Sequence, residues 1–237
     1  MKRFRFLSLP VGMLFALCTL GAFAAEDWPE VTEDGLERVS DSRMAVVYVE
    51  PGADLSAYSR VNLMEPTVAF KKNWERNQRS RSASKLPTSS RVNTSKIKKN
   101  LANEFQLVFT ETLNSGGFPV VEEIGEDVLL VRPSIVDLDV NAPESRGSGR
   151  TNSYVRSAGE MTLYLELYDS VTGDIIVKAL DRRADRENHD MYTWANSTTN
   201  KMAADRILQG WADILLDALK EAKTYVVEVE VVEEVVE

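Results

Sequence analysis

The sequence has a single cysteine and a single histidine in 237 residues, and this scarcity narrows the chemistry open to it. The cysteine, Cys18, lies in an amino-terminal segment for which we predict removal, which would leave neither a disulfide framework nor a cysteine ligand. The histidine, His189, lies in a charged run typical of a solvated loop, and no HExxH or paired-histidine spacing is present. The nucleophile-elbow and phosphate-loop patterns are absent too. We therefore expect no enzymatic activity and no cofactor.

The first 24 residues have the layout of an export signal. Three cations in the first five residues precede an apolar run over residues 6–20, which is shorter than the ~20 residues needed to span a bilayer. Small side chains at Ala22 and Ala24 fit the general signal peptidase, which predicts cleavage after Ala24 and a periplasmic protein. The alternative is a lipid anchor at Cys18, although the bulky residue before this cysteine is unfavourable for the lipoprotein peptidase.

Positive charge is less abundant than negative charge, and it is unevenly distributed along the chain. The formal net charge of −9 becomes −12 when the three cations of the signal are removed, which disfavours a nucleic-acid partner. Against this acidic background, residues 71–95 hold seven cations and one acid, and we predict a flexible basic surface loop there. Its best candidate contacts for an anionic partner are Lys71, Lys72, Trp74, Arg76, Arg79 and Arg81, with the indole offering a stacking surface. The alternative is a solvated loop that only aids solubility.

The remaining segments predict one domain with an extension at each end. Residues 25–43 are polar and aperiodic, which indicates an extended leader, and the domain is predicted over residues 44–223. Residues 224–237 form an acidic tail dominated by valine and glutamate. Its charge favours a disordered extension, and its imperfect alternation leaves an edge strand as the alternative.

Two amphipathic helices and several strands are predicted within the domain. Apolar residues recur at spacings of three and four over residues 96–113 and again over residues 199–223. A β-hairpin is predicted from Met161–Tyr168 through a turn at Gly173 to Ile175–Leu180. Further strand candidates are residues 45–49, 60–70, 118–121 and 128–140. Pro66 favours an edge position or a bend in the second of these, and Pro133 is expected to divide the last. The expected class is α+β, a mainly antiparallel sheet with both helices packed on one face.

Two short patterns suggest chemistry only weakly. Asp137 and Asp139 are two apart in a predicted strand, so they would share a face and could hold a cation or a proton. A half-exposed strand shows the same spacing without any site. Gly147-Ser148-Gly149-Arg150 resembles part of a phosphate loop, but no helix is predicted to follow it, so we expect a flexible loop.

One set of motifs resembles a known family. It comprises the run from Val49 to Val61, Val68-Ala69-Phe70 with Trp74, Ala158-Gly159-Glu160-Met161-Thr162, the run from Glu166 to Gly173, and Asp181-Arg182-Arg183. In this order the motifs resemble the bacterial family catalogued as domain of unknown function 3313, over roughly residues 44–222. The resemblance implies an exported envelope protein, often a lipoprotein, and brings no catalytic residues with it.

We therefore expect an exported protein with a non-catalytic binding or accessory role in the periplasm or at the outer membrane. Its partner would be another envelope protein or an anionic envelope polymer. The first alternative is a hydrolase of an envelope polymer that uses carboxylates such as Asp137 and Asp139. The second is a carrier of a small ligand, which would require a sizeable internal pocket.

Overall fold

The structure is a computed structural model that describes residues 28–77, 94–140, 154–155, 159–184, 193–194 and 197–236. The predicted signal peptide with Cys18, the loop at Gly147–Arg150 and His189 lie outside the described residues.

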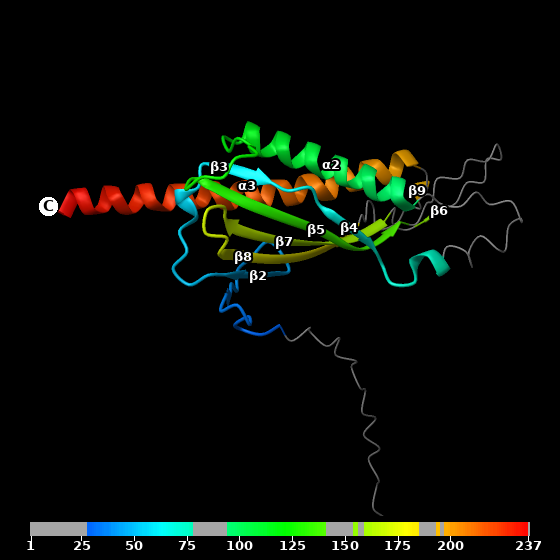
Figure 1. The fold of residues 1–237 in the computed structure, drawn as a ribbon, viewed down its shortest axis with the longest axis horizontal. Helices are drawn as coiled ribbons and strands as arrows, with labels where there is room; N and C mark the ends of the chain where they lie inside the picture. The colour runs from blue at the N-terminus through cyan, green and yellow to red at the C-terminus, as the bar shows by residue number, and fades with distance from the viewer. Residues whose placement is uncertain are drawn as a thin grey trace, which may run out of the picture.

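A seven-stranded sheet forms the centre of the fold (Figure 1). Its order is β1-β2-β8-β7-β5-β3, and β4 also pairs with β5. The strands are β1 (Glu37–Arg38), β2 (Val46–Val49), β3 (Arg60–Leu63), β4 (Thr67–Phe70), β5 (Val128–Val140), β7 (Gly159–Asp169) and β8 (Ile175–Ala184). Strands β3 and β4 run parallel to β5, whereas the other pairs are antiparallel. A separate pair joins β6 (Tyr154–Val155) to β9 (Thr193–Trp194), and a 3-10 turn, η1, spans Leu55–Ala57.

The predicted hairpin is confirmed as β7 and β8, the middle of the sheet. Alternate leucines of β7 are buried, as the period of two requires. The turn closes because Gly173 takes a φ of +76°, a region that costs glycine little. In addition, Asp169 Oδ1 accepts hydrogen bonds from the backbone N–H groups of Val171 (2.8 Å) and Thr172 (2.7 Å).

Both prolines of the predicted strands lie where no ladder bond is lost. Pro66 falls between β3 and β4, so the predicted strand over residues 60–70 is two short edge strands. The predicted division at Pro133 is wrong, because β5 runs through this residue as one strand. The carbonyl of Val131 accepts from Met64 N at the β3 edge, and residues two apart point the same way. The missing N–H of Pro133 therefore faces the gap between β3 and β4.

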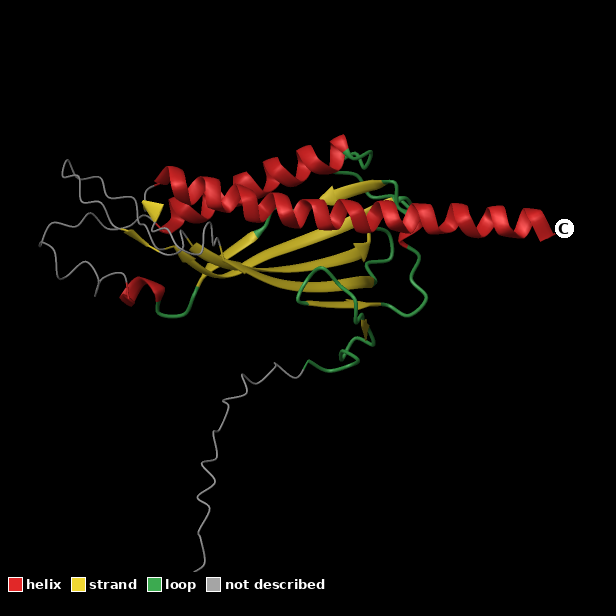
Figure 2. Cartoon of the chain, turned by 180° about the vertical axis from the view of Figure 1, so that it is seen from behind, coloured by secondary structure: helices red, strands yellow, loops and turns green. Residues whose placement is uncertain are grey.

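Two helices cover one face of the sheet, as predicted (Figures 1 and 2). Helix α2 spans Thr94–Ser115 and α3 spans Ser197–Val236. The helices are parallel, because Lys201 meets Glu104 (2.6 Å) and, two turns later in both helices, Gln209 donates to Thr112 Oγ1 (3.0 Å). The α+β class and the mainly antiparallel sheet are thus confirmed.

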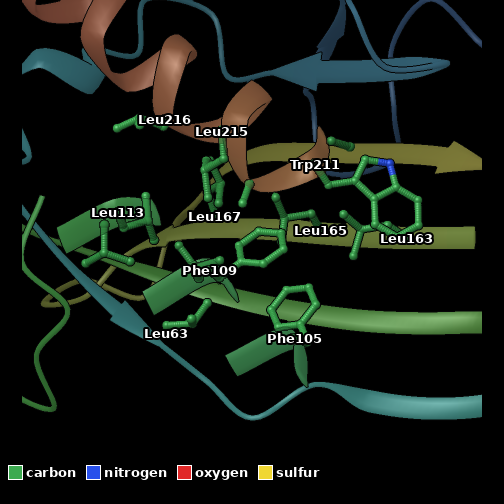
Figure 3. Packing of buried hydrophobic residues seen from close by; sticks show 14 of the residues in the cluster. Leu63, Phe105, Phe109, Leu113, Leu163, Leu165, Leu167, Trp211, Leu215 and Leu216 are labelled. Carbon is green, nitrogen blue, oxygen red and sulfur yellow. The ribbon is translucent and has the colours of Figure 1, made fainter. Parts of the chain in front are cut away.

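The core lies between the helices and the sheet (Figure 3). Phe105 and Phe109 of α2 stack with their ring centroids 3.9 Å apart, and both are fully buried. Trp211 of α3 lies over β7 and β8, and its Nε1 donates to Asp181 Oδ2 (2.8 Å). Burial of each large apolar side chain contributes roughly 1.5–3 kcal/mol, so these aromatic residues stabilise the contact together with the buried aliphatic side chains around them.

The amino-terminal boundary of the domain lies earlier than predicted. The segment expected to be a leader is packed against the sheet from Trp28 onward. Leu36 is only 1% exposed and contacts Val46 and Tyr48 on the sheet face opposite the helices. Tyr48 Oη also donates to the carbonyl of Pro29 (2.8 Å). The sequence did not predict this packing, because a few apolar residues without a regular spacing indicate neither a strand nor a helix.

The carboxy-terminal tail also differs from the prediction. Helix α3 continues to Val236, so the backbone of the acidic tail is helical where we expected disorder. It extends beyond the end of the sheet (Figure 1). An existing helix propagates without a new nucleation step, and glutamate is a good helix former, so this extension costs less than an isolated helix would.

Candidate functional site

The candidate site is a pocket beside the end of strand β4, where the predicted basic segment begins. After β4 the chain turns through Asn73, whose φ is +66°, and a helical turn starts at Trp74. This turn brings the Trp74 ring onto Phe70, with the centroids 4.2 Å apart and the planes 23° from parallel. The pocket has a volume of about 500 Å³ and is lined by Ala69, Phe70, Lys71, Asn73, Trp74, Glu75, Arg76, Thr94 and Lys98.

The first turns of α2 form the other wall of the pocket. Lys98 Nζ lies 5.8 Å from the centroid of the Phe70 ring, a cation–π contact. Within the described part of the chain, this is the contact found for the Lys98 ammonium, and no carboxylate neutralises it. The next lysine, Lys99, is exposed and does not line the pocket.

Lys71 forms ion pairs with carboxylates of the protein itself. Its Nζ lies 2.8 Å from Glu160 Oε1 and 3.9 Å from Asp139 Oδ2, and Arg182 also contacts Glu160 (2.8 Å). The hydrogen bond to Glu160 raises the pKa of Lys71. Conversely, the hydrogen bond from Lys71 lowers the pKa of Glu160 despite partial burial. Lys71 therefore joins β4 to β5 and β7, and we assign it a mainly structural role.

Trp74 is buried, with 3% of its surface exposed. One face of its ring stacks on Phe70, so the open stacking surface predicted from sequence is not present. Among the described residues, its Nε1–H is buried without a hydrogen-bond partner. An unpaired buried donor costs roughly 1–3 kcal/mol, so this group needs an explanation beyond packing.

The structure separates the six predicted contact residues. Lys71, Trp74 and Arg76 line the pocket, whereas Lys72 is exposed and does not. Arg79 and Arg81 lie outside the described residues. Sequence reasoning missed Phe70 and Lys98. One feature of the sequence could have indicated Lys98. The predicted helix begins where the basic segment ends, so a lysine in its first turns can lie near the start of that segment if the segment folds back.

The carboxylate pair of β5 is not arranged as predicted. A β-bulge occurs between Val136 and Asp139, and Asp137 takes a φ of +51°. The extra residue breaks the alternation of the strand, so Asp137 and Asp139 are not successive side chains of one face. Instead the bulge moves Asp139 onto the face of Val136, opposite the core, where it meets Lys71.

The described residues contain neither a metal-binding cluster nor a membrane-crossing helix. No three of their histidine, cysteine, aspartate or glutamate side chains are grouped so that they could hold a metal ion. No helix in the same ranges combines the length and the apolar character that a membrane crossing needs.

Comparisons with known structures give distant likenesses. The PelC dodecamer from Paraburkholderia phytofirmans is 11% identical, with a TM-score of 0.32, over 69% of this chain and 94% of that chain. A point variant of the same PelC dodecamer is 12% identical, with a TM-score of 0.33, over 69% of this chain and 93% of that chain. A putative neuraminyllactose-binding hemagglutinin homolog from Helicobacter pylori is 14% identical, with a TM-score of 0.39, over 70% and 89%. These values are too low to support an inference about function.

Sequence comparison is more decisive about the family. No curated protein matches the chain. A family model, described as a protein of unknown function (DUF3313), matches residues 30–215. This range includes every strand of the central sheet, helix α2 and the first half of α3 up to Leu215, short of the buried Leu216 and Leu219. It also agrees with an amino-terminal boundary near Trp28. The chain belongs to the DUF3313 family.

Proposed function

We propose that this DUF3313 protein is exported to the periplasm and binds an anionic component of the bacterial envelope, without catalysing a reaction on it. The sheet and its two helices serve as a scaffold, and the pocket beside β4 is the contact surface. The export part of the proposal rests on the amino-terminal signal predicted from the sequence, which lies outside the described residues. A lipid anchor at Cys18 is the alternative form of the same proposal.

The observation that carries the binding proposal is the gathering of Lys98 and Arg76 around a stacked aromatic pair. Both residues line one pocket with Phe70 and Trp74. The whole chain has a formal net charge of −9, so a locally basic pocket runs against the average of the surface. Local positive potential with low-dielectric walls concentrates anions, which makes this pocket the most favourable place for an anionic partner to bind.

The test is salt-dependent retention of the purified mature chain on two anionic matrices, phosphocellulose and immobilised polygalacturonate. The double variant Arg76→Gln/Lys98→Gln removes two positive charges from the pocket. The control Lys72→Gln/Lys99→Gln removes the same charge from two exposed lysines outside it. We expect the pocket variant to elute at clearly lower salt and the control to elute close to the wild type. Equal behaviour of the two variants on both matrices would refute the proposal.

The two alternative functions fare differently. The hydrolase proposal relied on Asp137 and Asp139 sharing a face, and the bulge removes that basis.

The carrier proposal has a specific feature in its favour, a second pocket of about 300 Å³ between the amino-terminal segment and the sheet. Trp28, Val46, Tyr48 and Leu180 give it apolar walls. Its lysine, Lys178, is already paired with Asp34, so an anionic ligand is better served by the pocket beside β4.

A further inference from the structure

We infer that the pocket beside β4 binds a small organic oxyanion, with one ligand oxygen accepting a hydrogen bond from Trp74 Nε1 and the negative charge facing Lys98. This inference rests on the proposed function and specifies its ligand. The shared chemistry is an anionic oxygen group, either a carboxylate or a phosphate. Both occur on acidic sugars and on phosphorylated envelope components.

The first argument is the unpaired indole. Trp74 is 3% exposed, and its Nε1–H has no partner among the described residues. Indole nitrogen is a donor only, so an acceptor alone can satisfy it. Buried polar groups in proteins are overwhelmingly paired, and an exception at a pocket wall points to a ligand atom. A charged oxygen is the strongest acceptor available for such a group.

The second argument is the way positive charge is distributed. Lys71 is held by Glu160 and Asp139, so its charge is compensated within the protein. Lys98 instead faces the Phe70 ring, which leaves its ammonium available for an anion. Glu75 also lines the pocket, and it disfavours a highly charged ligand. A ligand with one oxyanion group therefore fits the pocket better than a polyanion.

The third argument concerns size. A pocket of about 500 Å³ exceeds what a bare carboxylate or phosphate would occupy and lies within the range of roughly 300–1,000 Å³ typical of small-molecule sites. The walls formed by Phe70 and Ala69 are apolar and suit the body of an organic molecule. The ionic group would be held by Lys98 and Trp74, while the remainder lies against these walls.

The experiment is titration of the purified mature chain with galacturonate and, separately, with inorganic phosphate and glucose 6-phosphate. Binding is followed by calorimetry and by the indole ¹H–¹⁵N signals in NMR spectra. Trp74→Phe identifies the Trp74 signal by its disappearance and keeps an aromatic ring against Phe70. Lys98→Gln removes the pocket charge, and Lys72→Gln is the matched control outside the pocket. Thermal unfolding checks that each variant is folded.

We expect at least one oxyanion to move the Trp74 indole proton signal. Trp74→Phe should weaken binding about tenfold, the usual size for a hydrogen bond to a charged group. Lys98→Gln should weaken it about fivefold or more, and Lys72→Gln should change it less than about twofold. Galacturonate binding without phosphate binding would assign a carboxylate ligand, and the reverse would assign a phosphate.

Three results would overturn the inference. They are equal weakening by Lys72→Gln and Lys98→Gln, unchanged affinity in a folded Trp74→Phe variant, and no binding of any of the three probes. If the probes fail but the chain is still retained on the anionic matrices through Arg76 and Lys98, the inference falls and the proposed function stands. Loss of both the probe binding and the retention on the matrices would refute the inference and the proposed function together.

Discussion

The carboxylate of Asp181 connects three parts of the fold. This carboxylate is 8% exposed and accepts from Trp211 Nε1 (2.8 Å), Arg183 Nε (2.8 Å) and the backbone N–H of Ala45 (3.2 Å). It thereby joins β8 to α3 and to the chain entering β2. Replacing an acceptor that serves three donors leaves buried groups unpaired, a change with a larger cost than the loss of one surface contact.

Asp181→Ala should lower the free energy of unfolding by about 2–5 kcal/mol, because the Trp211 N–H and the Arg183 guanidinium lose their acceptor. Urea denaturation followed by tryptophan fluorescence measures this. The control is Asp213→Ala on the same helix α3, where the exposed carboxylate contacts Gln209. We expect that variant to stay within about 0.5 kcal/mol of the wild type. Equal effects of the two substitutions would mean that the Asp181 network contributes little.

Two tyrosines give the stability a dependence on alkaline pH. Burial and a hydrogen bond to Asp169 raise the pKa of Tyr58 from 10.0 to about 12. Burial and the nearby charge of Glu166 raise the pKa of Tyr164 to about 12 as well. In the unfolded chain both phenols lose their protons near pH 10, so the folded state binds more protons between the two values. The contribution of these groups is complete below about pH 10 and is lost as pH rises toward about 12.

The Tyr58→Phe/Tyr164→Phe variant should therefore lose less stability than the wild type between about pH 9.5 and about pH 11.5. Chemical denaturation at intervals of about half a pH unit measures the slope in both proteins. Lysine deprotonation is common to the two, so the difference between the slopes reports the tyrosines alone. Identical slopes would contradict the prediction.

At the scale of elements, α2 and α3 approach each other at a glycine. A Cβ added at Gly116, just after α2, would lie 2.2 Å from Cδ1 of Leu216. The loop beyond it turns back through Gly117, with a φ of +92°, and the Phe118 N–H then donates to the Leu113 carbonyl (2.9 Å). Gly116 thus sets how closely the two parallel helices meet.

Gly116→Ala should destabilise the protein by about 1–3 kcal/mol through overpacking. Leu216→Ala should cost about 2–5 kcal/mol as a buried leucine truncation. The double variant should cost less than the sum of these, by about 0.5 kcal/mol or more, because the new methyl group fills space that the leucine leaves. Strict additivity in the double-mutant cycle would show that the two residues do not share this space.

Sequence patterns predicted the elements well where burial was periodic. The alternating leucines of β7 and the apolar stripes of both helices identified the hairpin, the helices and the α+β class. The candidate strand at residues 118–121 failed in part, because the structure gives it one bridge between Val61 and Val120. Asp137 was misplaced because a bulge depends on the partner strand, which a single strand's period cannot reveal. Composition marked Lys71 and Arg76 of the pocket. It could not mark Lys98 or the Phe70–Trp74 stack, because both reach the pocket through tertiary contacts.

At the scale of the whole molecule, the end of α3 extends beyond the sheet (Figures 1 and 2). Leu219 is the last buried core side chain that the structure describes on this helix. A chain truncated after Thr224 should therefore keep its free energy of unfolding within about 0.5 kcal/mol and lose only helical circular dichroism. A drop above about 1 kcal/mol would show that the tail packs on the body of the domain.

The long-range pairing of β2 with β8 has a consequence for how the chain acquires its fold. Ala45 is bonded to Asp181 across 136 residues, and the two parallel helices, which contact each other through Lys201 and Glu104, are separated in the chain by β5 and the hairpin. Folds dominated by such non-local contacts have a high contact order and form slowly. If the chain crosses a membrane amino-terminus first, as its signal predicts, β2 and α2 emerge long before the segments that cover them. Folding would then await release of α3, and until that point the apolar faces of β2 and α2 would stay uncovered and prone to aggregation.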